Sequence, residues 1–221
     1  HELAPRAPAI LSIQATGLAR RQAATRADTS VIGVSGGLDP RLALLVCLDA
    51  VRIRGLPASA VRALTMPGPG TSERTLASAR ALARAAGATL HEVPIAAAVA
   101  QHLEDLDHPP DRHDVVFENA QARERTQLLF NHANQVRGIV VGTGDLSELA
   151  LGWCTFNGDQ MANYNVNAGV PKTMIAYLVR WYARHRAANV LAEVLAEVLD
   201  TPISPELLPP ELSQRRCRQT S

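Results

Sequence analysis

The sequence predicts an α/β fold in which a parallel sheet is flanked by helices in three layers. Short β-branched runs alternate with longer helix-forming segments, and this alternation is typical of βαβ units. Apolar residues make up 47% of the 221 residues but aromatic residues only 4%, which favours closely packed helices over a β-sandwich. A chain of this length suits one large α/β domain, so we expect a single domain over residues 1–221.

Periodicity and glycine signals place the elements along the chain. Ile10, Ile13 and Leu18 have the spacing of one helix face, the first strand is β-branched, and Gly87 closes an Ala-rich helix. A fourth strand after a long polar helix extends the expected parallel sheet. In order, the predicted elements are helix 9–27, strand 31–34, helix 42–53, strand 61–66, helix 72–86, strand 89–95, helix 117–136, strand 138–141, helix 147–151, a helix that starts at Pro171, and helix 187–199.

Three segments are predicted to lack regular structure. Residues 108–114 are rich in Pro, His and Asp, and residues 201–210 form a Pro-rich extended tail. The Gly- and Asn-rich stretch that runs to Gly169 is a candidate functional loop. No internal repeat or low-complexity linker indicates a second domain.

The charge balance favours a small-molecule partner. Lys and Arg total 22 against 21 Asp and Glu, a formal net charge of +1, so no basic field indicates DNA, RNA or an acidic membrane surface. The sequence has no run of about 18 apolar residues and no signal-peptide pattern, which predicts a cytoplasmic location and no membrane partner.

The cysteines and histidines predict neither a disulfide framework nor a zinc site. Cys47, Cys154 and Cys217 are odd in number and widely spaced, and Cys47 has the apolar neighbours of a core residue. The seven histidines show no metal-ligand spacing. All seven are predicted to lie on the surface or in loops, among them His91, His102, His108 and His113.

A glycine turn between the first strand and its helix is a candidate phosphate site. In Ser35-Gly36-Gly37-Leu38-Asp39, the glycines let backbone N–H groups approach phosphate oxygens, and the following helix N-terminus adds positive potential. A tight βα turn has the same signature, so the motif alone leaves both interpretations open.

Four further stretches, 65–74, 117–125, 142–148 and 163–172, decide between them. Together with the glycine turn they closely resemble the synthetase (ATP-pyrophosphatase) domain of glutamine-dependent NAD synthetases, over about residues 10–210. The resemblance implies an adenine nucleotide α-hydrolase-like fold and ATP-dependent amidation of nicotinic acid adenine dinucleotide (deamido-NAD) to NAD. The substrate carboxylate attacks the α-phosphorus of ATP to give an acyl-adenylate and pyrophosphate, and ammonia then displaces AMP.

The resemblance also implies partners and domain organisation. Ammonia is expected either free or from glutamine through a separate glutaminase domain, and the family predicts a homodimer. In residues 1–221 we find no counterpart of the N-terminal glutaminase domain or of the family's C-terminal segment, and the chain diverges over 213–221.

Matching the family motifs residue by residue implies a set of site residues. Asp39 and Glu148 match the ligands of Mg²⁺, for which hard carboxylate oxygens are suited, and with Lys172 they form the predicted catalytic group. Trp153 would stack against the nicotinate ring, although a buried anchor is an equal alternative. The predicted ATP-binding residues are Gly33, Val34, Ser35, Gly36, Gly37, Leu38, Asp39, Thr143 and Lys172, and the predicted substrate-binding residues are Asn119, Arg123, Glu148, Trp153, Gln160 and Asn163.

The glycine turn departs from the family at its end. The family sequence continues Asp-Ser-Thr, whereas this chain has Asp39-Pro40-Arg41, which removes a hydroxyl and a backbone N–H donor. Arg41 could supply charge to a phosphate in compensation. The alternative hypothesis is therefore a degenerate nucleotide-binding module with little or no catalysis. A related enzyme that modifies another substrate, such as a GMP-synthetase-like protein, is less well matched by 117–125 and 142–153.

Overall fold

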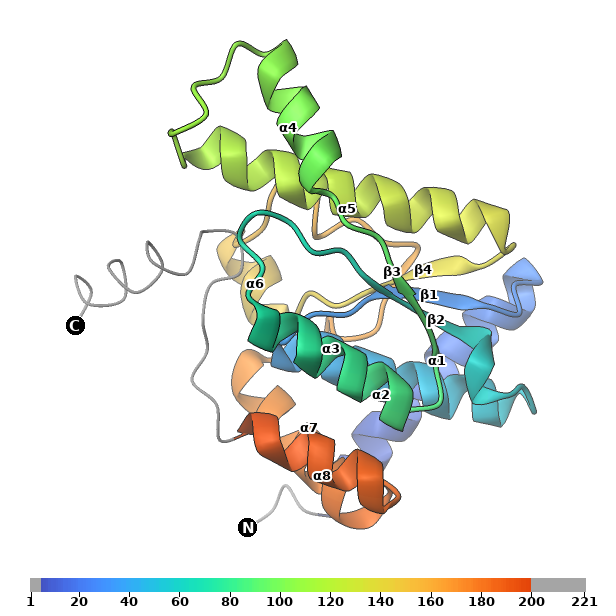
Figure 1. Cartoon of the computed structure of the whole chain (residues 1–221). Helices are drawn as coiled ribbons and strands as arrows, with labels where there is room; N and C mark the ends of the chain where they lie inside the picture. The colour runs from blue at the N-terminus through green and yellow to red at the C-terminus, as the bar shows by residue number, and fades with distance from the viewer. Residues whose placement is uncertain (1–4, 200–221) are drawn as a thin grey trace.

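The computed structural model describes residues 5–199, which form a five-stranded parallel sheet with helices on both faces (Figure 1). The strand order is β3-β2-β1-β4-β5, and every neighbouring pair is parallel. Because the order reverses direction beside β1, the loops after β1 and β4 diverge and leave a crevice at the carboxyl ends of the strands. The strands are β1 (Ser30–Gly33), β2 (Val61–Thr65), β3 (Thr89–Glu92), β4 (Ile139–Gly142) and β5 (Tyr164–Asn165).

Eight α-helices and one 3₁₀ turn connect these strands within the described residues. In Figure 1, α4 and α5 cover one face of the sheet, while α1, α2, α3, α7 and α8 lie on the other. They are α1 (Ala7–Thr25), α2 (Leu38–Ile53), the 3₁₀ turn η1 (Ala58–Ala60), α3 (Glu73–Ala85), α4 (Ala96–Asp105), α5 (Val115–Gln135), α6 (Leu146–Leu151), α7 (Lys172–His185) and α8 (Asn189–Leu199).

Strand alternation divides the core between the two faces. In β1, Ile32 packs into the larger cluster with α1, α2 and α7, whereas its neighbour Val31 packs into the smaller cluster with α4 and α5. Successive side chains of a strand point to opposite faces, so each buried strand holds both helix layers at once. Cys47 is fully buried in the larger cluster, and burial raises the pKa of its thiol to about 12. This confirms its prediction as a core residue.

The predicted fold class is confirmed, with small shifts in the element ends. The largest shift is in α2, which begins at Leu38 rather than at residue 42 and so contains Pro40 in its first turn. Proline is tolerated there because the first N–H groups of a helix have no intrahelical acceptor. Strand β3 ends at Glu92, before Pro94, and not at residue 95.

Besides the short 3₁₀ turn η1, two elements were not predicted. Helix α4 buries only Val99 completely, so its apolar stripe is too narrow to be recognised from periodicity. Strand β5 has only two residues and exists because the Asn-rich stretch pairs with the end of β4. The predicted Pro-rich tail at 201–210 lies outside the described residues.

His91 corrects the prediction of a surface or loop position, whereas His108 lies in a loop as predicted, although its side chain is largely buried. The His108 side chain is only 7% exposed and pairs with Asp114 at 3.1 Å. His91 lies in β3, and its ring centroid is 4.7 Å from that of His132 on α5.

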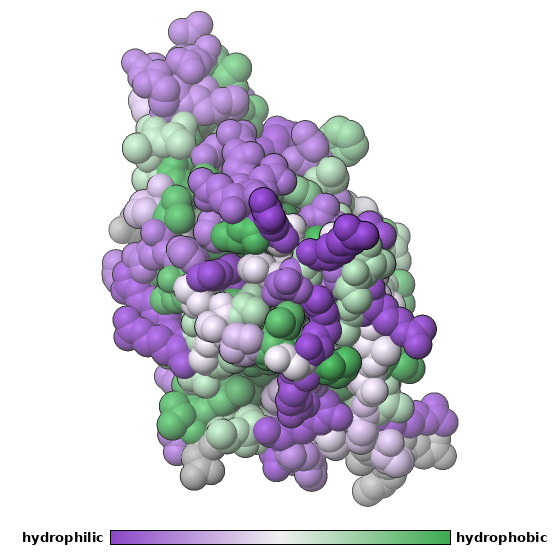
Figure 2. All heavy atoms as spheres, turned by 90° about the vertical axis from the view of Figure 1, so that its right-hand side faces the viewer, coloured by the Kyte–Doolittle hydropathy of each residue, from purple (hydrophilic) through white to green (hydrophobic). Residues whose placement is uncertain are grey.

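One face of the molecule carries hydrophilic and hydrophobic residues side by side (Figure 2). Figure 2 shows the side of the molecule where α5 ends and β4 begins, and there hydrophilic and hydrophobic residues are interspersed. None of the helices within residues 5–199 combines the length and the apolar character that crossing a membrane requires.

Gly142 provides a stability prediction, because β5 approaches β4 closely at this point. A Cβ on Gly142 would lie 2.8 Å from Ala162 Cβ and 3.2 Å from Asn165 Cβ. We expect Gly142→Ala to lower the free energy of unfolding by about 1–3 kcal/mol, the usual cost of overpacking. Urea denaturation measures it. Gly169→Ala is the control, since no atom lies within 4 Å of its added Cβ, and equal losses in the two variants would contradict the prediction.

Candidate active site

A cleft of about 410 Å³ opens at the carboxyl ends of β1, β2 and β4. The loop after β1, the loop after β4 and one side of α5 form its walls. This is the position at which open parallel sheets generally bind ligands. Of the predicted residues, it is lined by Gly33, Val34, Ser35, Gly37, Asp39, Thr143, Glu148 and Gln160.

The loop after β1 is held from both sides. Val34 N–H donates to the Leu64 carbonyl at 2.8 Å, which extends the pairing of β1 and β2 beyond the strands. Gly37 N–H donates to Ser35 Oγ at 3.3 Å, and Gly37 is the N-cap of α2. The remaining N–H groups at the start of α2 therefore lie beside the cleft, as an anion site requires.

Arg41 lies beneath this loop. Its side chain is fully buried, and Nη2 donates to the Gly36 carbonyl at 3.1 Å and to Ser78 Oγ of α3 at 2.8 Å. The guanidinium thus supports the loop backbone and is not part of the cleft lining. Any compensation for Pro40 would have to act through this support rather than through direct phosphate contact.

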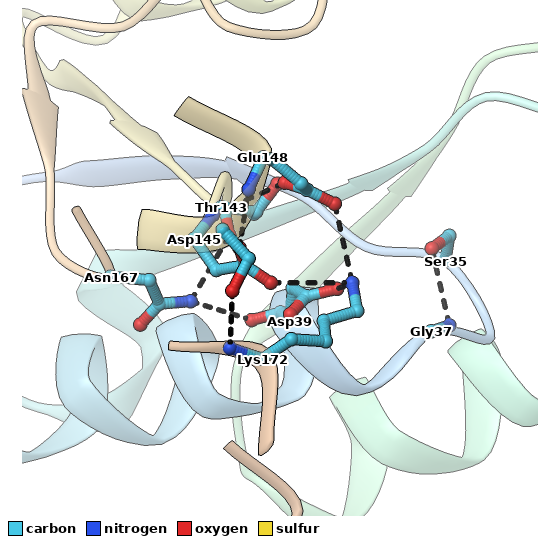
Figure 3. A network of polar contacts seen from close by, with 9 residues as sticks. Ser35, Gly37, Asp39, Thr143, Asp145, Glu148, Asn167 and Lys172 are labelled. Atoms are coloured by element: carbon cyan, nitrogen blue, oxygen red, sulfur yellow. Dashed lines mark hydrogen bonds and ion pairs between the residues drawn. The ribbon is translucent and has the colours of Figure 1, made fainter. Parts of the chain in front are cut away.

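Three carboxylates and one ammonium group lie together where the loop after β1 enters α2 (Figure 3). One oxygen from each of Asp39, Asp145 and Glu148 lies within 4.8 Å of the others. Lys172 Nζ donates to Asp39 Oδ2, lies 3.2 Å from Glu148 Oε1, and lies 3.4 Å from Asp145 Oδ2. These four residues, Asp39, Asp145, Glu148 and Lys172, are called the acidic cluster below.

Local helix ends place the cluster. Asp145 is the N-cap of α6 and accepts from Glu148 N–H at 2.8 Å, while Glu148 Oε2 accepts from Asp145 N–H at 3.1 Å. This reciprocal capping box fixes both carboxylates relative to each other. Lys172 begins α7, and its N–H donates to Ser147 Oγ at 3.1 Å, which fixes α7 to α6.

Burial and charge act in opposite directions in the cluster. Burial raises the pKa of the Asp39 carboxyl, and the hydrogen bond from Lys172 only partly offsets it. For Lys172, burial acts to lower the pKa, but the hydrogen bonds and negative charges of Asp39 and Glu148 together outweigh it, so the pKa is raised. Lys172 is therefore a firmly held cation. It is the only lysine in the sequence, in which all other Lys or Arg positions are arginine.

The cluster has the donor set for a hard divalent cation. Asp39 Oδ1 and Asp145 Oδ2 are buried and accept no hydrogen bond in the described structure, although Asp145 Oδ2 faces Lys172. Buried carboxylate oxygens without donors are costly unless a cation offsets them. The residues therefore fit Mg²⁺, which takes carboxylate and phosphate oxygens.

Four of the predicted substrate residues do not line the cleft, namely Asn119, Arg123, Trp153 and Asn163. Asn119 and Arg123 of α5 hold the loop after α6: Thr155 Oγ1 donates to Asn119 Oδ1 at 2.8 Å, and Arg123 Nε donates to the Phe156 carbonyl at 3.2 Å. Asn163 Oδ1 accepts from Val140 N–H at 2.7 Å. Trp153 is 78% exposed, so the alternative of a buried anchor is wrong, and Trp153 does not line the cleft.

Comparison with known proteins agrees with this geometry. A family model described as NAD synthase matches residues 13–210. The glutamine-dependent NAD(+) synthetase of Mycobacterium leprae is 48% identical over 204 residues, 90% of this chain and 30% of that relative. That of Synechocystis sp. is 34% identical over 161 residues, 71% of this chain and 28% of the relative. The chain belongs to the NAD synthase family.

Solved structures place the NAD synthase chain in the same fold. A glutamine-dependent NAD⁺ synthetase from Acinetobacter baumannii, in complex with ADP, has a TM-score of 0.77 at 28% identity, covering 88% of this chain and 36% of the other. An NMN synthetase from Francisella tularensis has a TM-score of 0.76 at 24% identity, covering 92% of this chain and 78% of the other, and so supports the fold alone. The chain spans about 30% of the length of its Mycobacterium leprae relative.

Sequence reasoning about this NAD synthase family chain overlooked Asp145 and Asn167. Asp145 is recognisable in retrospect, because Asp145 and Glu148 have the spacing of a capping box. Asn167 is fully buried and contacts two distant loops, a role that no local pattern encodes.

Proposed function

We propose that this domain binds Mg-ATP in the cleft and amidates deamido-NAD to NAD through an acyl-adenylate. The observation that carries the proposal is the acidic cluster, in which Lys172 and three carboxylates adjoin the glycine turn at the carboxyl edge of the sheet. Curated relatives named glutamine-dependent NAD(+) synthetase and a structural neighbour in complex with ADP support the same assignment.

The first chemical step needs positioning more than acid or base chemistry. A carboxylate oxygen of the substrate forms a bond to the α-phosphorus, and the bond from that phosphorus to the bridging oxygen breaks, which releases pyrophosphate. The N–H groups of the turn from Ser35 to Gly37 would bind the leaving phosphates. Mg²⁺, when bound by Asp39 and Glu148 with Asp145 beside them, would neutralise charge that develops on the leaving group.

In the second step, ammonia forms a bond to the acyl carbon, loses a proton, and AMP leaves with the electron pair of the broken C–O bond. Lys172 belongs to the acidic cluster, and its flexible side chain would turn toward the phosphates to balance their charge. Asn119, Arg123, Gln160 and Asn163 are proposed to hold the deamido-NAD, and Trp153 to cover its nicotinate end. These roles, with Thr143 at ATP, rest on the family motifs.

The direct test measures pyrophosphate release by the purified chain with Mg-ATP, ammonium and deamido-NAD, and calorimetry measures Mg-ATP binding in the same preparation. We expect release only when deamido-NAD is present. Nicotinic acid mononucleotide replaces it in the control, to separate dinucleotide from mononucleotide recognition. Mg-ATP binding without substrate-dependent release would contradict catalysis and favour the degenerate-module alternative, in which case Pro40→Ser is expected to restore release.

A further inference from the structure

One buried amide joins the two segments that carry the acidic cluster. Asn167 Nδ2 donates to the carbonyl of Asp39 and to the carbonyl of Thr143, each at 3.1 Å (Figure 3). Asp39 belongs to the first turn of α2, whereas Thr143 precedes the capping box of α6. Along the chain, these two segments are separated by everything from α2 to the end of β4. The Asn167 amide therefore connects residues that are far apart in sequence.

The amide itself is oriented by a second one. Gln14 Nε2 of α1 donates to Asn167 Oδ1 at 3.1 Å and to the Val166 carbonyl at 2.8 Å. Because Asn167 Oδ1 accepts from Gln14, its Nδ2 must face the two carbonyls, and the reverse orientation would oppose acceptor to acceptor. Asn167 is fully buried and Gln14 is 8% exposed, so water competes little for these bonds.

We propose that Asn167, oriented by Gln14, is a positioning residue that sets the spacing between Asp39 and the Asp145–Glu148 pair. Both hydrogens of one planar NH₂ group are used, so the two carbonyls are held at a fixed separation and angle. Asn167 holds the backbone carbonyl of Asp39, so it also fixes the place from which the Asp39 carboxylate extends. The proposal rests on the proposed function for its ligand, Mg-ATP, but its geometric content concerns the two loops alone.

The chain offers a matched control on the same helix. Gln22 of α1 is also fully buried, and its Nε2 donates to Ser30 Oγ at 2.9 Å. Both Gln14 and Gln22 leave Oε1 without a hydrogen bond in the described structure. Ser30 is the first residue of β1, at the end of the strand opposite the cleft. Replacing Gln14 by leucine removes two buried hydrogen bonds and replacing Gln22 by leucine removes one, but only the substitution of Gln14 affects the connection to the acidic cluster.

The experiment compares Gln14→Leu, Asn167→Asp and Gln22→Leu in the full chain. Three measurements are made: the thermal unfolding midpoint, hydrogen–deuterium exchange of peptides that cover 34–41 and 142–148, and the affinity for Mg-ATP by calorimetry. Asn167→Asp keeps the shape of the side chain but turns an oxygen toward two carbonyls. Gln14→Leu tests the same connection should the aspartate variant fail to fold.

We expect Gln14→Leu and Asn167→Asp to accelerate exchange in both loop peptides and to weaken Mg-ATP binding by at least about 10-fold. Gln22→Leu should lower the unfolding midpoint without changing the exchange of the loop peptides or the affinity for Mg-ATP. Equal exchange in the loop peptides of all three variants, or unchanged exchange in Gln14→Leu, would overturn the proposal. If the wild type bound no Mg-ATP, the proposed function would be wrong, whereas loop exchange would still decide the role of Asn167.

Discussion

Asp39→Asn is expected to lower the rate of pyrophosphate release by at least about 100-fold. The substitution keeps the shape of the side chain but removes one of the charges proposed to hold Mg²⁺, and it breaks the ion pair with Lys172. The free energy of unfolding should change little, because burial already disfavours the charged form of this carboxyl and raises its pKa. Release assays at saturating Mg-ATP, together with urea denaturation, measure the two effects.

Asp49→Asn is the matched control, because Asp49 is a second buried aspartate on α2. Its Oδ1 accepts from Tyr182 Oη at 3.0 Å, and its Oδ2 pairs with Arg186 at 2.6 Å, away from the cleft. Removing this carboxylate weakens a partly exposed ion-pair network, so we expect a loss of about 2 kcal/mol in stability with pyrophosphate release retained. If Asp49→Asn abolished release and Asp39→Asn did not, the placement of the active site would be wrong.

Local signals account for what could be predicted of the fold. Alternating β-branched and helix-forming segments give the parallel sheet, since each such segment has its own periodicity. The two-residue strand β5 has no such periodicity and depends on the approach of Asn165 to Gly142 at the end of β4. It is a consequence of packing, so no window of sequence contains it.

The site divides in the same way. The turn from Ser35 to Asp39 was predictable because a strand, two glycines and a helix follow one another in the sequence. The sequence left open whether Arg41 supplies charge to a phosphate, and the structure buries it under Gly36 with Ser78 of α3 as its partner. The side chain follows the inward face of α2, which becomes known only when α3 is placed beside it. Asn167 is a similar case, because its two acceptors belong to loops that adjoin only in the folded chain.

Lys172→Met is expected to strengthen the binding of a divalent cation in the absence of nucleotide while it abolishes turnover. Lys172 Nζ lies among the same carboxylate oxygens of Asp39, Asp145 and Glu148 that would hold the ion. An ammonium and a metal ion cannot occupy this space together, so the two compete for these oxygens. Removing the ammonium leaves three carboxylates that only a cation can balance.

Mn²⁺ binding, measured by paramagnetic relaxation of water protons, tests this competition. We expect Lys172→Met to raise the affinity for Mn²⁺ by about 10-fold or more, and to lower pyrophosphate release by at least about 100-fold because the phosphates lose their cation. Lys172→Arg, which keeps the charge, should leave the Mn²⁺ affinity near that of the wild type. A Lys172→Met variant with unchanged Mn²⁺ affinity would show that the ion binds elsewhere, and the metal assignment of Asp39 and Glu148 would then fail independently of catalysis.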